Sequence, residues 1–479
     1  MCLSARFLPL VLLNAFFLAA ALPGFAVQAQ VCQGSFELDT QAEVDAFDCA
    51  EVTGNLMIGG VVSSIDSLHS LVSVGGTLRL SSRGGLNDLA GLGALVSAGT
   101  LFITHNESLV HLNGLTSLSE VGNIHISGNE ELLDVAGLLA LTYVEGDVVI
   151  AGNDVLSTLE GLAGLTSVGG LLSINRSNAL SDLDGLHNIV SVGSLTVYES
   201  ENLTNLRGLG ALASVGEAAY IYNNDALADL GGLNNLIAVE GLLEISYNSA
   251  LYSLQGLESL LSIGELVIEG NGVLTNLEGL DALASTDDNL IITGNGALTD
   301  LDNLNGLTAI GGRLQINAND ALPHLDGLAN LIAVAEGLRV FSNNVLSSCT
   351  VGLYDLLAND GVGGDIDISN NATGCNSVEE ILNSVDAEDE ATPAVTALAA
   401  PFPNPTAGTT TLAFTLAELA DVRLTVYDAL GRRVATLADG PHASGTHEAA
   451  WGAGLPAGTY VVRFETSEEA WTERVTLVR

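Results

Sequence analysis

The sequence predicts a mainly β protein in which a long solenoid of stacked coils precedes a small antiparallel β-sandwich. Three observations predict this architecture. A pattern of leucine, glycine and asparagine recurs every 22 to 24 residues through most of the chain, and short apolar–polar–apolar triplets recur in phase with it. A period of this length is typical of a solenoid. From residue 401 onward the chain instead alternates apolar and polar residues between turn residues, which is typical of antiparallel strands.

Residues 1–29 have the pattern of a secretory signal peptide. Arg6 is the only early charge, an almost unbroken apolar run extends from Phe7 to Ala21, and small residues precede a cleavage point after Ala29. A membrane anchor is the alternative, but the run is shorter than a bilayer span. We therefore expect cleavage after Ala29 and no transmembrane segment in the mature chain.

Four cysteines remain after that cleavage, and they lie in pairs at the two ends of the repeats: Cys32 with Cys49, and Cys349 with Cys375. Export makes disulfides chemically reasonable, so we expect each pair to form one. Each bond would close a loop of about 20 residues, which is worth about 3 kcal/mol in the chain-entropy model. A metal site is the alternative. The cysteines have no CxxC spacing and no histidine close in sequence, which disfavours it.

The repeat has the form GLxxLxxVGGxLxIxxNxxLxxLx, and one copy begins at Gly161. The cores of 14 copies can be found, from Leu56–Ile58 to Ile366–Ile368. Each LxI triplet predicts a short strand with two apolar side chains directed inward and the middle one outward. At a spacing of about 4.8 Å, stacked coils make a parallel sheet about 65 Å long. Because no coil can bury its leucines alone, stacking must stabilise the array.

An asparagine stands three residues after most of these triplets. We expect a structural ladder in which the amides satisfy the main chain at the bend between coils, rather than a polar binding row. Asparagine also tolerates the left-handed conformation that such a bend requires. The ladder comprises Asn106, Asn129, Asn153, Asn224, Asn248, Asn271, Asn295, Asn319, Asn343 and Asn371.

This pattern resembles leucine-rich repeats, and more closely the receptor L-domain repeats of growth-factor-receptor ectodomains and fungal cell-wall proteins. The resemblance covers about Cys32 to Val385. It implies a right-handed, receptor L-domain-like solenoid over residues 30–385, with the cysteine-bounded ends as its caps. It does not imply a ligand, because the scaffold hosts many unrelated binding tasks.

Residues 386–400 are acidic and then rich in alanine and threonine, which predicts a linker. Residues 401–479 contain five alternating segments, and these predict a small immunoglobulin-like β-sandwich. The segments are 411–416, 422–427, 433–437, 459–464 and 474–478.

The same C-terminal residues resemble the type A sorting domain of the type IX secretion system, which has the form PNP…VYDxxGR…W…LxxGxY…R. The matching positions include Pro403, Asn404, Pro405, Tyr427, Gly431, Arg432, Gly458 and Tyr460. The resemblance implies a bacterial protein that the type IX machinery carries across the outer membrane, to be attached to the surface or released. An ordinary fibronectin-like binding module is the alternative.

Charge excludes one class of partner. The chain has 57 acidic residues against 13 arginines and no lysine, a net charge of −44. Residues 30–400 carry 48 of the acids and 6 of the arginines. Such a surface repels phosphates, so we expect no nucleic-acid partner. The 48% hydrophobic content excludes a disordered acidic chain.

The sequence predicts neither an enzyme nor a cofactor. It has no HExxH, no GxSxG, no P-loop and no lysine for a Schiff base. Short connections between coils also leave no long loops to build a deep cleft. Acidic pairs could hold Ca²⁺, but their spacing fits no calcium motif, so we expect solvated loop carboxylates and no metal. These pairs are Asp182/Asp184, Asp287/Asp288, Asp300/Asp302 and Asp365/Asp367.

The outward strand positions are the candidate binding surface. Tyr198, Tyr220, Tyr222 and Glu244 should fall close together on three adjacent coils. Tyrosine offers apolar area and a hydrogen-bonding tip, which suits a glycan or a protein ligand. We therefore predict a secreted or surface-attached binding or adhesion protein without enzymatic activity. A structural envelope component without a specific ligand is one alternative, and a carbohydrate-active enzyme is another.

Overall fold

The computed structural model of the chain describes residues 30–389, 396–417, 420–442, 445–467 and 469–478. The predicted signal peptide, residues 1–29, lies outside the described residues. The chain divides into two compact units, one up to Gly296 and one from Ala297 onward.

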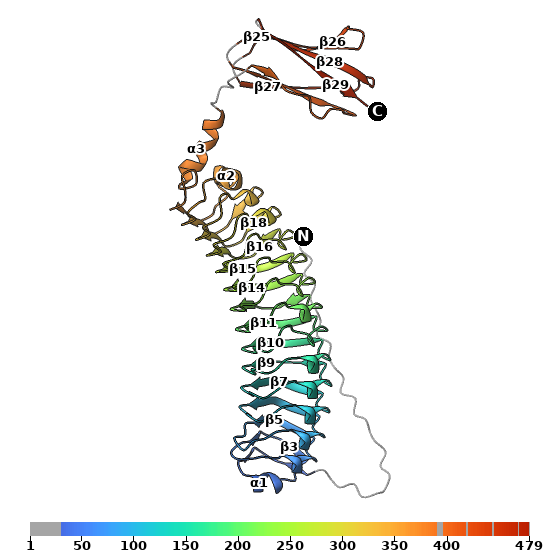
Figure 1. Ribbon diagram of the computed structural model, residues 1–479, viewed down its shortest axis with the longest axis vertical. Coiled ribbons are helices and arrows are strands. Elements are labelled where there is room, and N and C mark those ends of the chain that lie inside the picture. The colour runs from blue at the N-terminus through green and yellow to red at the C-terminus, as the bar shows by residue number, and fades with distance from the viewer. Residues whose placement is uncertain (1–29, 390–395, 418–419, 443–444, 468, 479) are drawn as a thin grey trace. The chain divides into compact units, whose positions relative to one another are not determined.

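The first unit is a stack of coils whose strands pair in parallel from one coil to the next (Figure 1). Its strands are β1 (Val31–Cys32), β2 (Phe36–Leu38), β3 (Glu51–Val52), β4 (Leu56–Ile58), β5 (Ser73–Leu80), β6 (Ser97–Thr104), β7 (Glu120–Ser127), β8 (Tyr143–Val144), β9 (Val148–Ala151), β10 (Ser167–Asn175), β11 (Ser191–Tyr198), β12 (Ser214–Val215), β13 (Ala219–Tyr222), β14 (Ala238–Ser246), β15 (Ser262–Glu269), β16 (Ser285–Thr286) and β17 (Leu290–Thr293).

The strand positions follow the apolar pattern of the triplets. In β10 the side chains of Leu172 and Ile174 are fully buried, and they pair in register with the matching residues of β9 and β11. The strand is longer than the triplet alone predicts. It also includes the recurring valine, Val168, and the two glycines that follow it, where the register with β11 shifts. The strand therefore begins at Ser167, before the triplet Leu172–Ile174 at which it was expected to begin.

The recurring GL lies in a one-turn 3₁₀ helix in some coils and in an ordinary turn in others, such as the one at Gly185, and its glycine permits the close approach of coils. A Cβ at Gly161, in η5 (Glu160–Leu162), would overlap the carbonyl oxygen of Val135 in the preceding coil. Ser67 holds the same place near the start of the stack, where its hydroxyl donates to the carbonyl of Val44 at 2.8 Å. The other turns of this unit are η1 (Asp66–Leu68), η2 (Ala90–Leu92), η3 (Asn113–Leu115), η4 (Ala136–Leu138) and η6 (Arg207–Leu209).

The N-terminal end contains one strand triplet that the repeat pattern missed. β2 pairs in register with β4, placing Phe36 beside Leu56. It escaped notice because no GLxxL segment precedes it. Helix α1 (Gln41–Asp45) follows, with a capping box between Thr40 and Glu43. The Cys32–Cys49 disulfide closes this end, as expected, with the two Cα atoms 5.8 Å apart.

The second unit begins with further coils of the same kind. Their strands are β18 (Ala309–Ile310), β19 (Arg313–Asn317), β20 (Ala333–Val334), β21 (Gly337–Phe341) and β22 (Asp365–Ser369), and their turns are η7 (Asp302–Leu304) and η8 (Asp326–Leu328). β19 pairs with β21, and β21 with β22, all in parallel. β22 departs from the triplet pattern of two inward apolar residues, because Ile366 is 42% exposed rather than buried.

Two helices close these coils. α2 (Thr350–Ala358) takes the place of the last 3₁₀ turn, and α3 (Val378–Asp389) follows β22. The expected Cys349–Cys375 disulfide joins the start of α2 to the loop before α3. Of the predicted linker 386–400, residues 386–389 belong to α3, Ala397–Leu398 form the short strand β23, and residues 390–395 lie outside the described residues.

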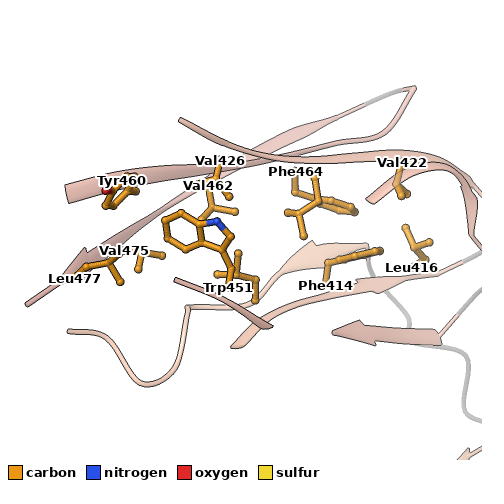
Figure 2. Packing of buried hydrophobic residues seen from close by; sticks show 12 residues of the cluster. Phe414, Leu416, Val422, Val426, Trp451, Tyr460, Val462, Phe464, Val475 and Leu477 are labelled. Atoms are coloured by element: carbon orange, nitrogen blue, oxygen red, sulfur yellow. The ribbon is translucent and has the colours of Figure 1, made fainter. Parts of the chain in front are cut away.

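The C-terminal residues form two antiparallel sheets, β23–β24–β27 and β26–β25–β28–β29. Side chains from both sheets meet in one core, where Phe414 stacks on Phe464 at 4.6 Å (Figure 2). Sequence analysis missed β27, because the residues before Trp451 that face the core are His447 and Ala449 rather than large apolar ones. The strands are β24 (Thr410–Leu416), β25 (Ala420–Tyr427), β26 (Arg433–His442), β27 (Gly445–Trp451), β28 (Gly458–Glu465) and β29 (Ala470–Leu477).

Candidate functional site

The asparagine row lies beneath the surface. Nine of its ten members are fully buried, Asn371 being partly exposed. Asn129 illustrates the bonding: its side-chain oxygen accepts the main-chain N–H of Asn106 at 3.1 Å, and its side-chain nitrogen donates to the carbonyl of Ile103 at 2.9 Å. The main-chain N–H of Asn129 in turn donates to Asn153 at 3.0 Å. These amides therefore bond to the main chain, and the nine buried ones present no surface to a ligand.

The four residues singled out as a binding surface do come together. Tyr198 on β11 pairs in register with Tyr222 on β13, and their rings stack with centroids 4.8 Å apart and planes 6° apart. Tyr220 pairs with Glu244 on β14. All four side chains are partly exposed. The strands thus hold a stacked aromatic pair near a carboxylate on the outward face.

Sequence reasoning missed two further residues of this surface. The Arg176 guanidinium carbon lies 6.0 Å from the centre of the Tyr198 ring, and the same group pairs with the Glu199 carboxylate at 2.5 Å. That hydrogen bond raises the pKa of Arg176. Both residues follow the strand rather than lying within it, so the triplet pattern did not single them out.

These two residues occupy a left-handed bend that recurs from coil to coil, where the residue type varies. Arg176 and Glu199 stand directly before the asparagine position, where the chain adopts φ values of 48° and 50°. Gly128 and Gly152 hold the same place in other coils. Glycine adopts this conformation without strain, whereas other residues do so at a cost. Strained positions with large polar side chains are candidates for function.

Acidic groups border the tyrosines on the side of the following coils. Glu244 accepts the Ser246 hydroxyl at 2.7 Å, and Tyr247 donates to Glu269 at 2.5 Å. The bond to Glu269 raises the pKa of the Tyr247 hydroxyl. Burial raises the pKa of Tyr222, and the nearby Tyr198, Glu199 and Glu244 add to that effect. These phenols are therefore neutral, hydrogen-bonding groups at physiological pH.

Two of the acidic pairs bond within their own loops, whereas Asp365 and Asp367 lie in β22 rather than in a loop as expected. Asp182 accepts the main-chain N–H of Asp184 at 3.0 Å, and Asp300 accepts that of Asp302 at 3.4 Å. Within the described part of the chain, no group of three or more His, Cys, Asp or Glu side chains is placed to hold a metal ion. No helix among the described residues is long and apolar enough to cross a membrane.

The C-terminal motif residues fix turns and edges of the two-sheet domain. The Asn404 side chain donates to the carbonyl of Arg474 at 2.6 Å and accepts the N–H of Thr476 at 2.9 Å, which ties the chain before β24 to β29. Tyr460 donates to the carbonyl of Pro456 at 2.9 Å and packs edge-on against Trp451, as its place in Figure 2 shows.

A second group of motif residues builds the turn between β25 and β26. Asp428 accepts the main-chain N–H groups of Leu430 and Arg432, each at 2.9 Å, and the Arg432 guanidinium at 2.8 Å. The Arg432 N–H contributes most to lowering the pKa of Asp428. Gly431 has a φ of 76°, which glycine adopts without strain.

Residues 400–478 match the family described as "Secretion system C-terminal sorting domain". The sorting domain establishes that the protein travels by type IX secretion to the cell surface or the extracellular space, and so interacts with the type IX machinery. The motif positions predicted from the sequence, from Pro403 to Tyr460, all lie inside this match. Comparison of the chain with curated proteins finds no match.

Proposed function

We propose that the solenoid is a non-enzymatic binding or adhesion module, displayed or released outside the cell, whose outward strand face recognises a glycan or protein ligand. The observation that carries the proposal is the stacked Tyr198–Tyr222 pair with Arg176 and Glu199 beside it. Tyrosine and arginine are enriched at binding hot spots. A pair already stacked in the free protein loses little side-chain entropy when a ligand binds.

The sequence pattern supports the finer assignment of both parts. We place the repeats with leucine-rich repeats of the right-handed, receptor L-domain type, and the C-terminal sheets with immunoglobulin-like sandwiches. The regular sheet of a solenoid presents the side chains of successive coils in rows. Such rows form an extended surface that can bind a glycan or a protein.

Removing both rings of the tyrosine pair should weaken ligand binding. The full chain is screened on glycan and protein arrays, and its affinity for each ligand found is compared with the affinity of the variant Tyr198→Ala/Tyr222→Ala for the same ligand. Loss of two stacked rings should weaken binding about thirtyfold, equivalent to about 2 kcal/mol. Tyr252→Ala is the matched control, since Tyr252 is 51% exposed on a loop outside the strand face.

Unchanged affinity in the double variant would contradict the proposed face. A full chain that binds nothing on either array would favour a structural envelope component. Turnover of a polysaccharide by the purified protein would establish an enzyme instead.

A further inference from the structure

A shallow groove crosses the outward face next to the tyrosine pair. Its floor consists of small residues on successive coils: Ser127, Gly128, Ala151 and Gly152. Larger side chains bound it, with His105 and His125 at one end and Arg176 and Tyr198 at the other. The groove exists because two neighbouring coils have glycine where the flanking coils have histidine or arginine.

Each end of the groove carries a pair of rings. His125 packs against Phe102 on β6 with ring centroids 5.1 Å apart, and Tyr198 stacks on Tyr222. From β6 to β11 the sheet takes four steps, which at about 4.8 Å a step is about 19 Å. The distance between the ring pairs exceeds the length of a single sugar ring and suits a chain of several.

The groove also differs in charge from the rest of the solenoid. All of its lining residues are described, and none is acidic, although residues 30–400 carry 48 acids. Its arginine, Arg176, is already paired with Glu199. Burial, and secondarily the charge of Arg79, lowers the pKa of His125, which favours its neutral form at pH 7. The groove therefore supplies no unpaired carboxylate for a cationic ligand, and the surrounding negative charge repels an anionic one.

The polar groups of the groove are neutral donors and acceptors. The Ser127 hydroxyl lies 3.0 Å from the His125 ring nitrogen, and the Asn175 amide donates to the Ser173 hydroxyl at 3.0 Å. A hydroxyl has one donor and two acceptor sites, so Ser127 retains capacity for a ligand. Aromatic rings at the ends of the groove, combined with neutral hydrogen-bonding groups, complement a sugar ring, which has apolar C–H faces and a rim of hydroxyls.

We infer that the ligand of the proposed recognition face is a neutral oligosaccharide that lies along this groove, between the Phe102–His125 and Tyr198–Tyr222 pairs. The inference rests on the proposed function and names its ligand class. It excludes acidic polysaccharides and cationic peptides as the main ligands.

The test fills the groove while leaving the charge unchanged. Ala151 is an outward residue at the centre of the floor, in register with Asn175, and tyrosine is favoured in strands. The full chain and its variant Ala151→Tyr are titrated calorimetrically with chito-, cello- and malto-oligosaccharides and with oligogalacturonate. Thr293→Tyr is the control, because Thr293 ends β17 at the position that Ala151 holds in β9.

We expect at least one neutral oligosaccharide to bind, and Ala151→Tyr to weaken that binding about tenfold or more, with an unchanged melting temperature. Thr293→Tyr should bind like the original chain, and oligogalacturonate should bind less tightly than the neutral sugar. Equal binding by Ala151→Tyr, or tighter binding of oligogalacturonate, would overturn the inference. A protein ligand that depends on Tyr198 and Tyr222, with no sugar bound, would overturn it while sparing the proposed function. Absence of binding to any ligand would contradict both this inference and the proposed function.

Discussion

Replacing Asn248 with alanine is expected to lower the free energy of unfolding of the solenoid by about 2–5 kcal/mol. The Asn248 oxygen accepts the main-chain N–H of Asn224 at 3.1 Å, and its amide nitrogen donates to the carbonyl of Ile221 at 2.9 Å. Both asparagines are fully buried. The substitution leaves buried polar groups without partners, each at a cost of about 1–3 kcal/mol, and it does so at the interface on which coil stacking depends.

Urea unfolding followed by circular dichroism measures this change, with Asn188→Ala as the matched control. Asn188 is exposed and donates a single side-chain bond, to the carbonyl of Ala163 at 2.9 Å. Its loss should cost no more than about 1 kcal/mol. Equal effects at the two positions would show that burial of the ladder does not govern the stability of the stack.

Removing residues 401–479 is expected to abolish delivery to the cell surface and the medium. The match over residues 400–478 assigns sorting to this domain, and the solenoid has no second copy of its motifs. The truncated chain should accumulate in the periplasm. Immunoblots of surface, medium and periplasmic fractions measure the distribution.

A reporter fusion complements the deletion. A periplasmic reporter fused to residues 401–479 should gain export, which shows that the sorting domain is sufficient as well as necessary. Surface levels of the truncated chain equal to those of the full chain would contradict the assignment.

The regular parts of the fold could be predicted from the sequence because the residue at a given position of the repeat has the same structural role in successive coils. Leu172 and Ile174 fill the coil, and Gly161 allows close approach to the preceding coil. Such roles leave a period that is visible in a single chain. The same reasoning placed Tyr198 beside Tyr222, because strand alternation and the repeat length fix both positions.

The remaining features depend on departures from the period. The groove arises where Gly128 and Gly152 interrupt a row of larger side chains, and absence of a side chain leaves no pattern in the sequence. Arg176 and Glu199 act from a left-handed bend outside the strand triplet. In the sorting domain, β27 went unnoticed because its pairing with β24 defines it, whereas Trp451 is the one buried side chain of the strand.

A crystal structure of the full chain bound to its tightest array ligand tests the central claim most directly, namely that the outward strand face is the recognition surface. Ligand density is expected on that face, in contact with Tyr198 or Tyr222 and extending over Ala151. Density on the 3₁₀ turns such as η5, or on the sorting domain, with the strand face empty, would contradict it.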